Sequence, residues 1–358
     1  MRFLLASAGL LVLAGAAGAA RPTAHTLRKD RVGPIVAIAQ NNGMAAWLAS
    51  STKSCNAVRI LSPGKHDRSL PQPPSVGQTC GWNLSEGPSQ LAVASRISTA
   101  LWTLHQNGPQ PFDWVMAASI GGPERQLRRL AHASNGTGLW LGGVAGGGRT
   151  LAYSWDDVEY VDPDACLSGG SCKQKIADGG IRLVSRTDVT NLPGAEPALQ
   201  LATAAGRIAY IPATVVKSGS PTVTLDNTLR IVDATTGEVL GQPFVRGIPI
   251  AIALSPQVLA VLTTSGPHDR ISWFSATDGT KLGNALVSPG APAALATSDR
   301  LIVYRSGRFL HGISTRTGRR VRLAPTALTT LGPSLARGRL IWAENHNRTG
   351  RLRALDVG

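Results

Sequence analysis

The chain contains 358 residues, of which 36 are Lys or Arg and 21 are Asp or Glu, so its formal net charge is +15. Its 40 Gly and 23 Pro are scattered along the whole length without a low-complexity linker, which argues against separate domains and favours one large repeat array. The charge is carried mainly by Arg and is spread along the chain, which excludes a basic tail and favours a surface that attracts anionic partners. Solubility alone is the competing explanation for this charge.

Residues 1–20 are predicted to be a secretory signal peptide. A positive charge at Arg2 precedes an uncharged stretch of Leu, Val, Ala and Gly that ends in small residues, with cleavage expected near Ala19 to Arg21. An uncleaved membrane anchor is the alternative, but the stretch is short for a membrane span and rich in Ala and Gly. We therefore expect a secreted, extracellular or cell-envelope protein, with one domain over residues 21–358 and no transmembrane segment after cleavage.

Seven short apolar segments recur along the rest of the chain, at intervals of about 40 to 55 residues, which suit the four-stranded blades of a propeller. Aligned on their third residue, six of the seven carry an aromatic side chain. Because this register is kept along the chain, it favours packing between blades over a sugar-binding surface. The third residues are Trp47, Trp102, Tyr153, Tyr210, Val261, Tyr304 and Trp342.

The neighbours of each segment complete a unit of four strands. Upstream lies an Ala-rich apolar run, such as residues 249–252, joined to the segment by a tight polar or Gly-containing turn, such as residues 204–207. Downstream comes a third strand and a turn with Gly at a fixed place, clearest at residues 229–240, 271–282 and 309–321. The sequence therefore predicts an all-β fold, a seven-bladed β-propeller with four-stranded antiparallel blades.

The turn from Asp233 to Gly237 resembles the Asp-x-x-Thr-Gly turn of the propeller superfamily that includes WD-repeat and pyrroloquinoline-quinone-type repeat proteins. The resemblance covers nearly all of the chain after residue 20, and it implies the propeller fold. The Trp that quinoprotein repeats place after this turn would fall near Gly241 or Gly283, and the Trp-Asp pair of WD repeats occurs once. The resemblance therefore implies no bound cofactor.

The last blade is predicted to close with a strand from the other end of the chain. Residues 351–357 have the pattern of a third strand, and no fourth strand follows them. An open edge exposes unpaired backbone groups, so a ring gains by closing. We expect Thr23 to Val32 to supply the missing outer strand.

The four cysteines are predicted to brace loops on one rim of the propeller. Connections from second to third strands and from blade to blade emerge together at this long-loop rim, and we expect function there. Four cysteines allow three pairings. We expect Cys55 to pair with Cys80 and Cys166 with Cys172, because each pair falls within the long connections of a single blade.

Two sets of residues are candidate sites. Clustered carboxylates on a braced loop are suited to calcium, although a solvated acidic loop paired with Arg or Lys is the alternative. Two tryptophans outside the aromatic register, near the long-loop rim, are candidates for ligand contact. The carboxylates are Asp156, Asp157, Glu159, Asp162 and Asp164, and the tryptophans are Trp82 and Trp155.

No signature of catalysis stands out, since the seven histidines are dispersed and neither His-Glu-x-x-His nor Gly-x-Ser-x-Gly is present. We therefore expect an exported, monomeric, non-catalytic binding or scaffold protein. Its partner is expected to be a protein or an anionic envelope polymer rather than nucleic acid. The alternative is a propeller enzyme, such as a lyase, lactonase or degenerate quinoprotein, with its site at the central funnel.

Overall fold

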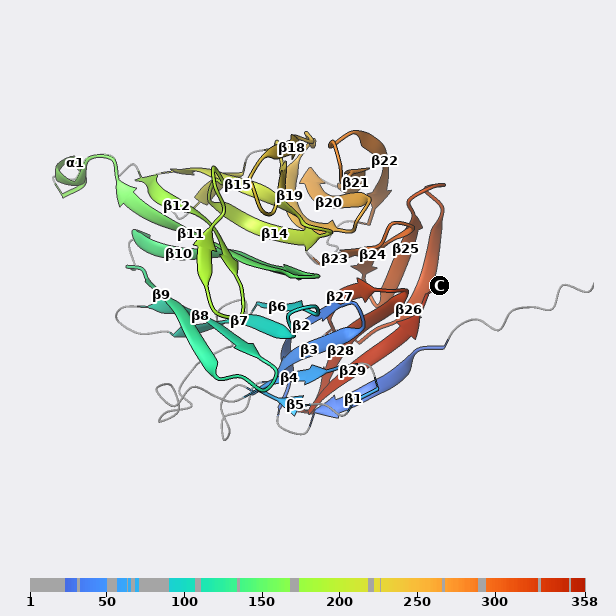
Figure 1. The fold of residues 1–358 in the computed structure, drawn as a ribbon. Helices are drawn as coiled ribbons and strands as arrows, with labels where there is room; N and C mark the ends of the chain where they lie inside the picture. The colour runs from blue at the N-terminus through green and yellow to red at the C-terminus, as the bar shows by residue number, and fades with distance from the viewer. Residues whose placement is uncertain are drawn as a thin grey trace, which may run out of the picture.

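Seven four-stranded antiparallel sheets follow one another around a central channel, in chain order, as the colours of Figure 1 show. Blade 4 carries one additional strand. The predicted seven-bladed β-propeller is therefore confirmed. The computed structural model describes residues 23–30, 33–49, 57–62, 64–65, 68–70, 90–106, 111–133, 136–167, 174–217, 222–225, 227–265, 268–288, 294–327, 330–347 and 349–357.

The first four blades run from the channel outward in sequence order. Blade 1 contains β2 (Ile35–Asn41), β3 (Met44–Ala49), β4 (Ala57–Leu61) and β5 (Arg68–Ser69). Blade 2 contains β6 (Leu91–Ala94), β7 (Thr99–Gln106), β8 (Phe112–Ser119) and β9 (Glu124–Ala131). Blade 3 contains β10 (Gly138–Gly147), β11 (Thr150–Tyr160), β12 (Gln174–Val184) and β13 (Val189–Asn191). Blade 4 contains β14 (Ala198–Ala204), β15 (Arg207–Lys217), β17 (Arg230–Asp233) and β18 (Val239–Gly241), and β16 (Thr222–Leu225) pairs with the far end of β15.

The last three blades follow the same order, except that the outer strand of blade 7 comes from the start of the chain. Blade 5 contains β19 (Ile248–Leu254), β20 (Val258–Ser265), β21 (His268–Ser275) and β22 (Lys281–Val287). Blade 6 contains β23 (Leu295–Thr297), β24 (Leu301–Ser306), β25 (Phe309–Ser314) and β26 (Arg320–Pro325). Blade 7 contains β27 (Thr330–Ala336), β28 (Arg339–His346), β29 (Thr349–Asp356) and β1 (His25–Asp30).

The closing strand lies within the predicted segment. β1 pairs antiparallel with β29, from His25 opposite Ala354 to Asp30 opposite Gly350. Blade 7 thus contains both ends of the described chain, and its outer edge is paired as the sequence predicts.

The core formed by the described residues is divided into seven apolar clusters, one between each pair of neighbouring blades. The residues of the aromatic register are at most 3% exposed, and each belongs to the cluster between its own blade and the preceding one. Trp47, for example, packs with Ile341 and Leu352 of blade 7. The interpretation of the register as interblade packing is therefore confirmed.

The Gly-containing turns connect the third and fourth strands of blades 4, 5 and 6. Gly237, Gly279 and Gly318 have φ angles of 75°, 75° and 67°, which disfavour a side chain. In blade 4 the Asp233 carboxylate accepts the N–H groups of Thr235 and Thr236, at 2.8 and 2.9 Å. These hydrogen bonds lower the pKa of Asp233.

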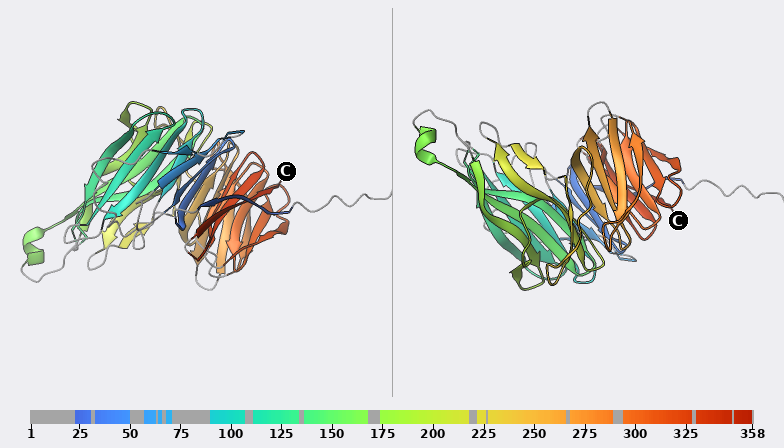
Figure 2. Two further views of the ribbon diagram at one scale, coloured as in Figure 1. Left: turned by 90° about the horizontal axis from the view of Figure 1, so that it is seen from below. Right: turned by 90° about the horizontal axis from the view of Figure 1, so that it is seen from above.

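Blade 3 departs from the expectation that the clustered carboxylates, from Asp156 onward, lie on a loop. Instead β11 and β12 continue as a hairpin to Tyr160 and Gln174, with the short helix α1 (Pro163–Leu167) beyond the last pair. Figure 2 shows α1 at the end of this projection, on the side of the propeller. The extension forms because the inner strand β10 is also long and pairs with β11 as far as Val158. Among the described residues, no helix has the length and apolarity to cross a membrane.

Candidate functional site at the channel mouth

The central channel holds a cavity of about 970 Å³. Its walls are the inner strands of all seven blades, and it reaches the turns that join the first and second strands of each blade, which we call the inner turns. The turns between third and fourth strands project to the same side, so we call this side the inner-turn face. The wall side chains are mainly small or aliphatic, for example Ile38, Leu91, Val144, Leu201, Ile252 and Leu295.

Glycines in β10 let the walls approach one another closely. A Cβ atom at Gly146 would lie 2.5 Å from the carbonyl oxygen of Val93 in blade 2, and a Cβ at Gly143 would lie 2.7 Å from the amide nitrogen of Leu201 in blade 4. Any side chain at these positions would push a neighbouring backbone away. The glycines at residues 142–143 and 146–147 therefore set the width of the channel on this side.

The mouth of the cavity at the inner turns is cationic. Among the residues that the structure describes, the mouth is lined by four exposed arginines, which are Arg96, Arg149, Arg300 and Arg337, and by one carboxylate, that of Asp299. Asp299 Oδ1, in the inner turn of blade 6, accepts a hydrogen bond of 2.9 Å from the backbone N–H of Gln257 in the inner turn of blade 5. Four guanidinium groups and one carboxylate give the mouth a positive potential, which low-dielectric walls focus.

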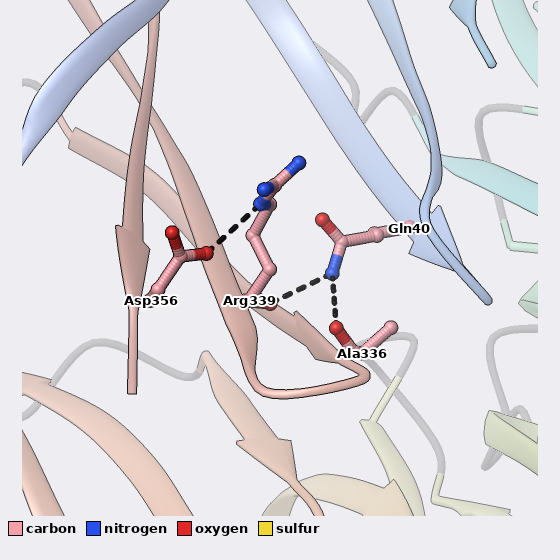
Figure 3. Close-up of polar contacts among 4 residues, drawn as sticks. All are labelled: Gln40, Ala336, Arg339 and Asp356. Atoms are coloured by element: carbon pink, nitrogen blue, oxygen red, sulfur yellow. Dashed lines mark hydrogen bonds and ion pairs between the residues drawn. The ribbon is translucent and has the colours of Figure 1, made fainter. Parts of the chain in front are cut away.

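Side chains of blade 1 hold the inner turns together. Gln40 Nε2 donates to the carbonyl oxygens of Ala336 and Arg339 in blade 7, at 3.3 and 2.8 Å, and Figure 3 shows this contact beside the ion pair of 3.0 Å between Arg339 and Asp356. Asn41 Oδ1 accepts the backbone N–H of Gly148 in blade 3, at 2.9 Å. The mouth is thus a fixed frame, which lowers the ordering cost of binding.

The chemistry of the lining suits binding better than proton transfer. A guanidinium stays protonated over the whole physiological pH range, so the four arginines offer charge and hydrogen-bond donors but no acid–base function. The described lining residues contain no histidine, cysteine or glutamate beside Asp299.

The structure places Trp155 in the interblade core. It lies on β11, is 7% exposed, and belongs to the cluster between blades 2 and 3. The guanidinium carbon of Arg128 lies 3.6 Å from the centroid of its ring, a cation–π contact. Trp82 lies outside the described residues, so ligand contact at either tryptophan stays a prediction.

The acidic cluster is distributed over two faces of β11 and the segment beyond it. Successive strand residues point to opposite faces, which separates Asp156 from Asp157 and Glu159. Asp156 is buried, and burial, followed by the neighbouring charge of Asp157, raises its pKa to about 6. Asp162 lies between β11 and α1, and Asp164 lies in the first turn of α1. In the part of the chain that the structure describes, no three His, Cys, Asp or Glu side chains are placed to share a metal ion, and calcium stays a prediction.

The predicted cysteine pairs fall largely on residues that are not described. Cys166 lies in α1, whereas Cys55, Cys80 and Cys172 lie outside the described residues, as does much of the long-loop rim. Both pairings stay predictions.

Sequence reasoning missed the arginines of the mouth. Each lies alone in a short turn, and they converge only when the ring closes. The available signal was the recurrence of Arg in or next to the inner turns of blades 2, 3, 4, 6 and 7, at Arg96, Arg149, Arg207, Arg300, Arg337 and Arg339.

No protein-family model and no curated protein sequence matches the chain. Solved structures similar to it are propellers of low sequence identity. The β-propeller domain of Cps50 (Swd1) from Myceliophteria thermophila is 12% identical over 94% of this chain and 100% of that one, with a TM-score of 0.53. A chain of the Mitotic Checkpoint Complex is 13% identical over 99% of this chain and 97% of that one, with a TM-score of 0.52. This similarity shows the fold, in agreement with the resemblance to WD-repeat propellers.

Proposed function

We propose that the protein is an exported, non-catalytic binding or scaffold protein that engages an anionic partner through its inner-turn face. The observation that carries the proposal is the channel mouth, where four exposed arginines face one carboxylate around an aliphatic cavity. The partner is a protein or an anionic polymer of the envelope. Export rests on the signal-peptide pattern of residues 1–20.

The fold supports a binding role. A propeller is a rigid scaffold whose turns and loops are free to vary, and such positions commonly carry function. One of the similar solved structures is a chain of a protein assembly, the Mitotic Checkpoint Complex. The present chain shares its propeller architecture over nearly the full length of both.

The proposal moves the working face from the long-loop rim to the opposite side. The long-loop rim was expected to carry function because its connections vary in length. The inner-turn face is favoured instead because it combines a cavity with a concentration of one charge. The alternative of an enzyme at the central funnel gains no support from the described lining, where Asp299 has no histidine beside it.

The test compares binding of the mature protein to immobilised heparin, polyglutamate and single-stranded DNA, at low and high salt. The variant R96S/R149S/R337S removes three charges from the mouth, and we expect binding to fall about tenfold at low salt. The control variant K175S/R246S/R351S removes three exposed charges from the other side of the propeller, where the long-loop rim lies. This variant should bind as the wild type does. Equal binding by both variants would contradict the proposal.

A further inference from the structure

We propose that the partner is an acidic protein segment that starts at the channel mouth and runs outward across blade 6. This inference rests on the proposed function and specifies the ligand of the same face. Its path is a row of cations that we call the arginine track, formed by Arg300, Arg316, Arg319 and Arg320.

The track is continuous because the two turns of blade 6 are bonded to each other. The backbone N–H of Thr315 donates to the carbonyl oxygen of Arg300 at 3.0 Å, and Thr315 Oγ1 donates to the carbonyl oxygen of Asp299 at 2.7 Å. Farther out, the N–H of Ser314 donates to the carbonyl oxygen of Arg319 at 3.0 Å. Arg300 at the mouth and Arg316 beyond it thus lie on one surface.

The charges of the track are available to a partner. All four side chains are exposed, and within the described ranges none forms an ion pair with Asp or Glu. Neighbouring like charges repel one another, so the unbound track carries an electrostatic cost that a polyanion would relieve.

Blade 5 shows that the turns do not need these arginines. Its outer turn has the same backbone pattern, with Gly279 donating to the carbonyl oxygen of Ser275 at 3.0 Å, as Gly318 does to that of Ser314 at 2.8 Å. At the positions of Arg300, Arg316 and Arg319, blade 5 carries uncharged residues, which are Gln257, Thr277 and Thr280. The turns therefore do not require the cations at Arg300, Arg316 and Arg319, whereas Arg320 has a basic counterpart, Lys281, in blade 5.

Protection of an exposed sheet edge explains only the outer end of the track. Charged residues on an edge strand discourage pairing with other chains. Arg320 and Arg322 lie on the edge strand β26, and Arg322 also stacks on the Phe309 ring, with 4.2 Å from its guanidinium carbon to the ring centroid. Arg300 and Arg316 lie in turns, where no edge needs protection.

The walls of the cavity favour a protein segment over other polyanions. Single-stranded nucleic acid binds largely by stacking its bases on aromatic side chains, and the described lining contains no aromatic residue. An anionic polysaccharide is polar throughout and gains little from aliphatic walls. An acidic peptide can place a Leu, Ile or Val side chain against Ile38, Leu91 or Leu295 while its carboxylates pair with guanidinium groups.

The experiment uses the mature protein and two labelled peptides, one of Glu interspersed with Leu and one in which Ser replaces each Leu. Binding is followed by fluorescence anisotropy at low salt. The variant R300Q/R316T/R319T introduces the residues that blade 5 tolerates, and we expect it to bind the Leu-containing peptide about tenfold more weakly. Replacing Leu by Ser should weaken binding to the wild type several-fold.

A relocation variant tests whether binding depends on the position of the track charges or only on the net charge of the protein. It combines R300Q/R316T/R319T with Q257R/T277R/T280R, so the lost charges reappear on blade 5. We expect it to bind as weakly as the triple variant. Thermal denaturation checks that both variants are folded. If either is not, the double variant R316T/R319T, which leaves the inner turn unchanged, is compared with the wild type instead. If the relocation variant binds as tightly as the wild type, the proposed path along blade 6 is wrong, whereas the proposed function of the inner-turn face still stands.

Two further outcomes would overturn the choice of ligand. Tighter binding of heparin or single-stranded DNA than of the Leu-containing peptide, lost in the same triple variant, would assign the track to another polyanion. Failure of the wild type to bind any of these probes at low salt would overturn the proposed function together with the inference.

Discussion

The indole N–H of Trp47 donates a hydrogen bond of 2.6 Å to the Asp30 carboxylate, which joins the last residue of the closing strand to blade 1. Arg59 Nε, also in blade 1, lies 3.0 Å from the same carboxylate oxygen. Asp30 is buried, and its strand is hydrogen-bonded to blade 7 through β29. One carboxylate thus ties both sides of the junction where the two ends of the ring meet.

We expect Asp30→Ala to lower the free energy of unfolding by about 3 kcal/mol, because it takes this acceptor away from a buried indole N–H and from the guanidinium beside it. Asp30→Asn keeps an oxygen for Trp47 but loses the charge and replaces the other oxygen by an amide NH2 group, so its cost should be smaller than that of Asp30→Ala, about 1 kcal/mol. Urea unfolding of the wild type and both variants measures the difference. Equal stability of the Ala variant and the wild type would show that this contact does not support ring closure.

The glycine run in β10 yields a second prediction. Gly146→Ala should destabilise the protein by about 1–3 kcal/mol, because its Cβ would lie within 2.7 Å of both the amide nitrogen and the carbonyl oxygen of Val93. Gly122→Ala is the matched control, since its Cβ would meet only Ser119 at ordinary contact distances of 3.5 and 3.6 Å. Thermal unfolding of both variants checks the prediction. A similar melting temperature for the two would contradict the close approach of blades 2 and 3.

The fold could be predicted because its packing repeats locally in the sequence. Six of the seven blades place one aromatic side chain at the same position of the second strand to fill the space beside the preceding blade, and Trp47, Tyr153 and Trp342 recur for this reason. The closing strand followed from the unpaired edge of the last blade. The hairpin in blade 3 could not be predicted, because its strand contains Asp156 and Asp157, which resemble loop residues until β10 is seen to extend beside them.

The site could not be predicted by the same reasoning, because it depends on distance in space. Arg96 and Arg337 are far apart in sequence and share the mouth only through ring closure. The pattern that was visible, Asp-x-x-Thr-Gly, belongs to the turn itself, where Asp233 accepts backbone N–H groups. Turn-forming residues repeat because the turn requires them, whereas the cations that distinguish blade 6 lie at positions where the turn does not require a particular side chain.

The two disulfide predictions and the export prediction can be checked together. We expect non-reducing peptide mapping of protein recovered from the culture medium or cell envelope to show Cys55 linked to Cys80 and Cys166 to Cys172. Its amino terminus should lie near Ala19 to Arg21, as signal cleavage requires. Either alternative pairing would refute the assignment by blade. Recovery of the full-length chain with Met1 in the cytoplasm would refute export.

The buried carboxyl of Asp156 should make stability fall as pH rises. Burial and, to a smaller extent, the repulsion of Asp157 together raise its pKa from the ordinary value of 3.8 to about 6. Between about pH 4 and pH 6 the folded protein therefore holds a proton that the unfolded chain has released, so the contribution of this group is fully present below that window and lost above it. The loss is about 3 kcal/mol at most, since a tenfold change in proton affinity corresponds to about 1.4 kcal/mol.

The variant Asp156→Asn removes this titration, so its unfolding free energy should be higher than that of the wild type at pH 7.5 and should change less between pH 4 and pH 7.5. Asp278→Asn is a control of opposite sign, because the hydrogen bond from the Thr280 N–H lowers the pKa of Asp278 and stabilises its charged form. That variant should lose stability at pH 7.5 instead of gaining it. Urea unfolding across this pH range decides the matter: a wild type and an Asp156→Asn variant with parallel pH profiles would show that Asp156 does not carry the proton in the folded state.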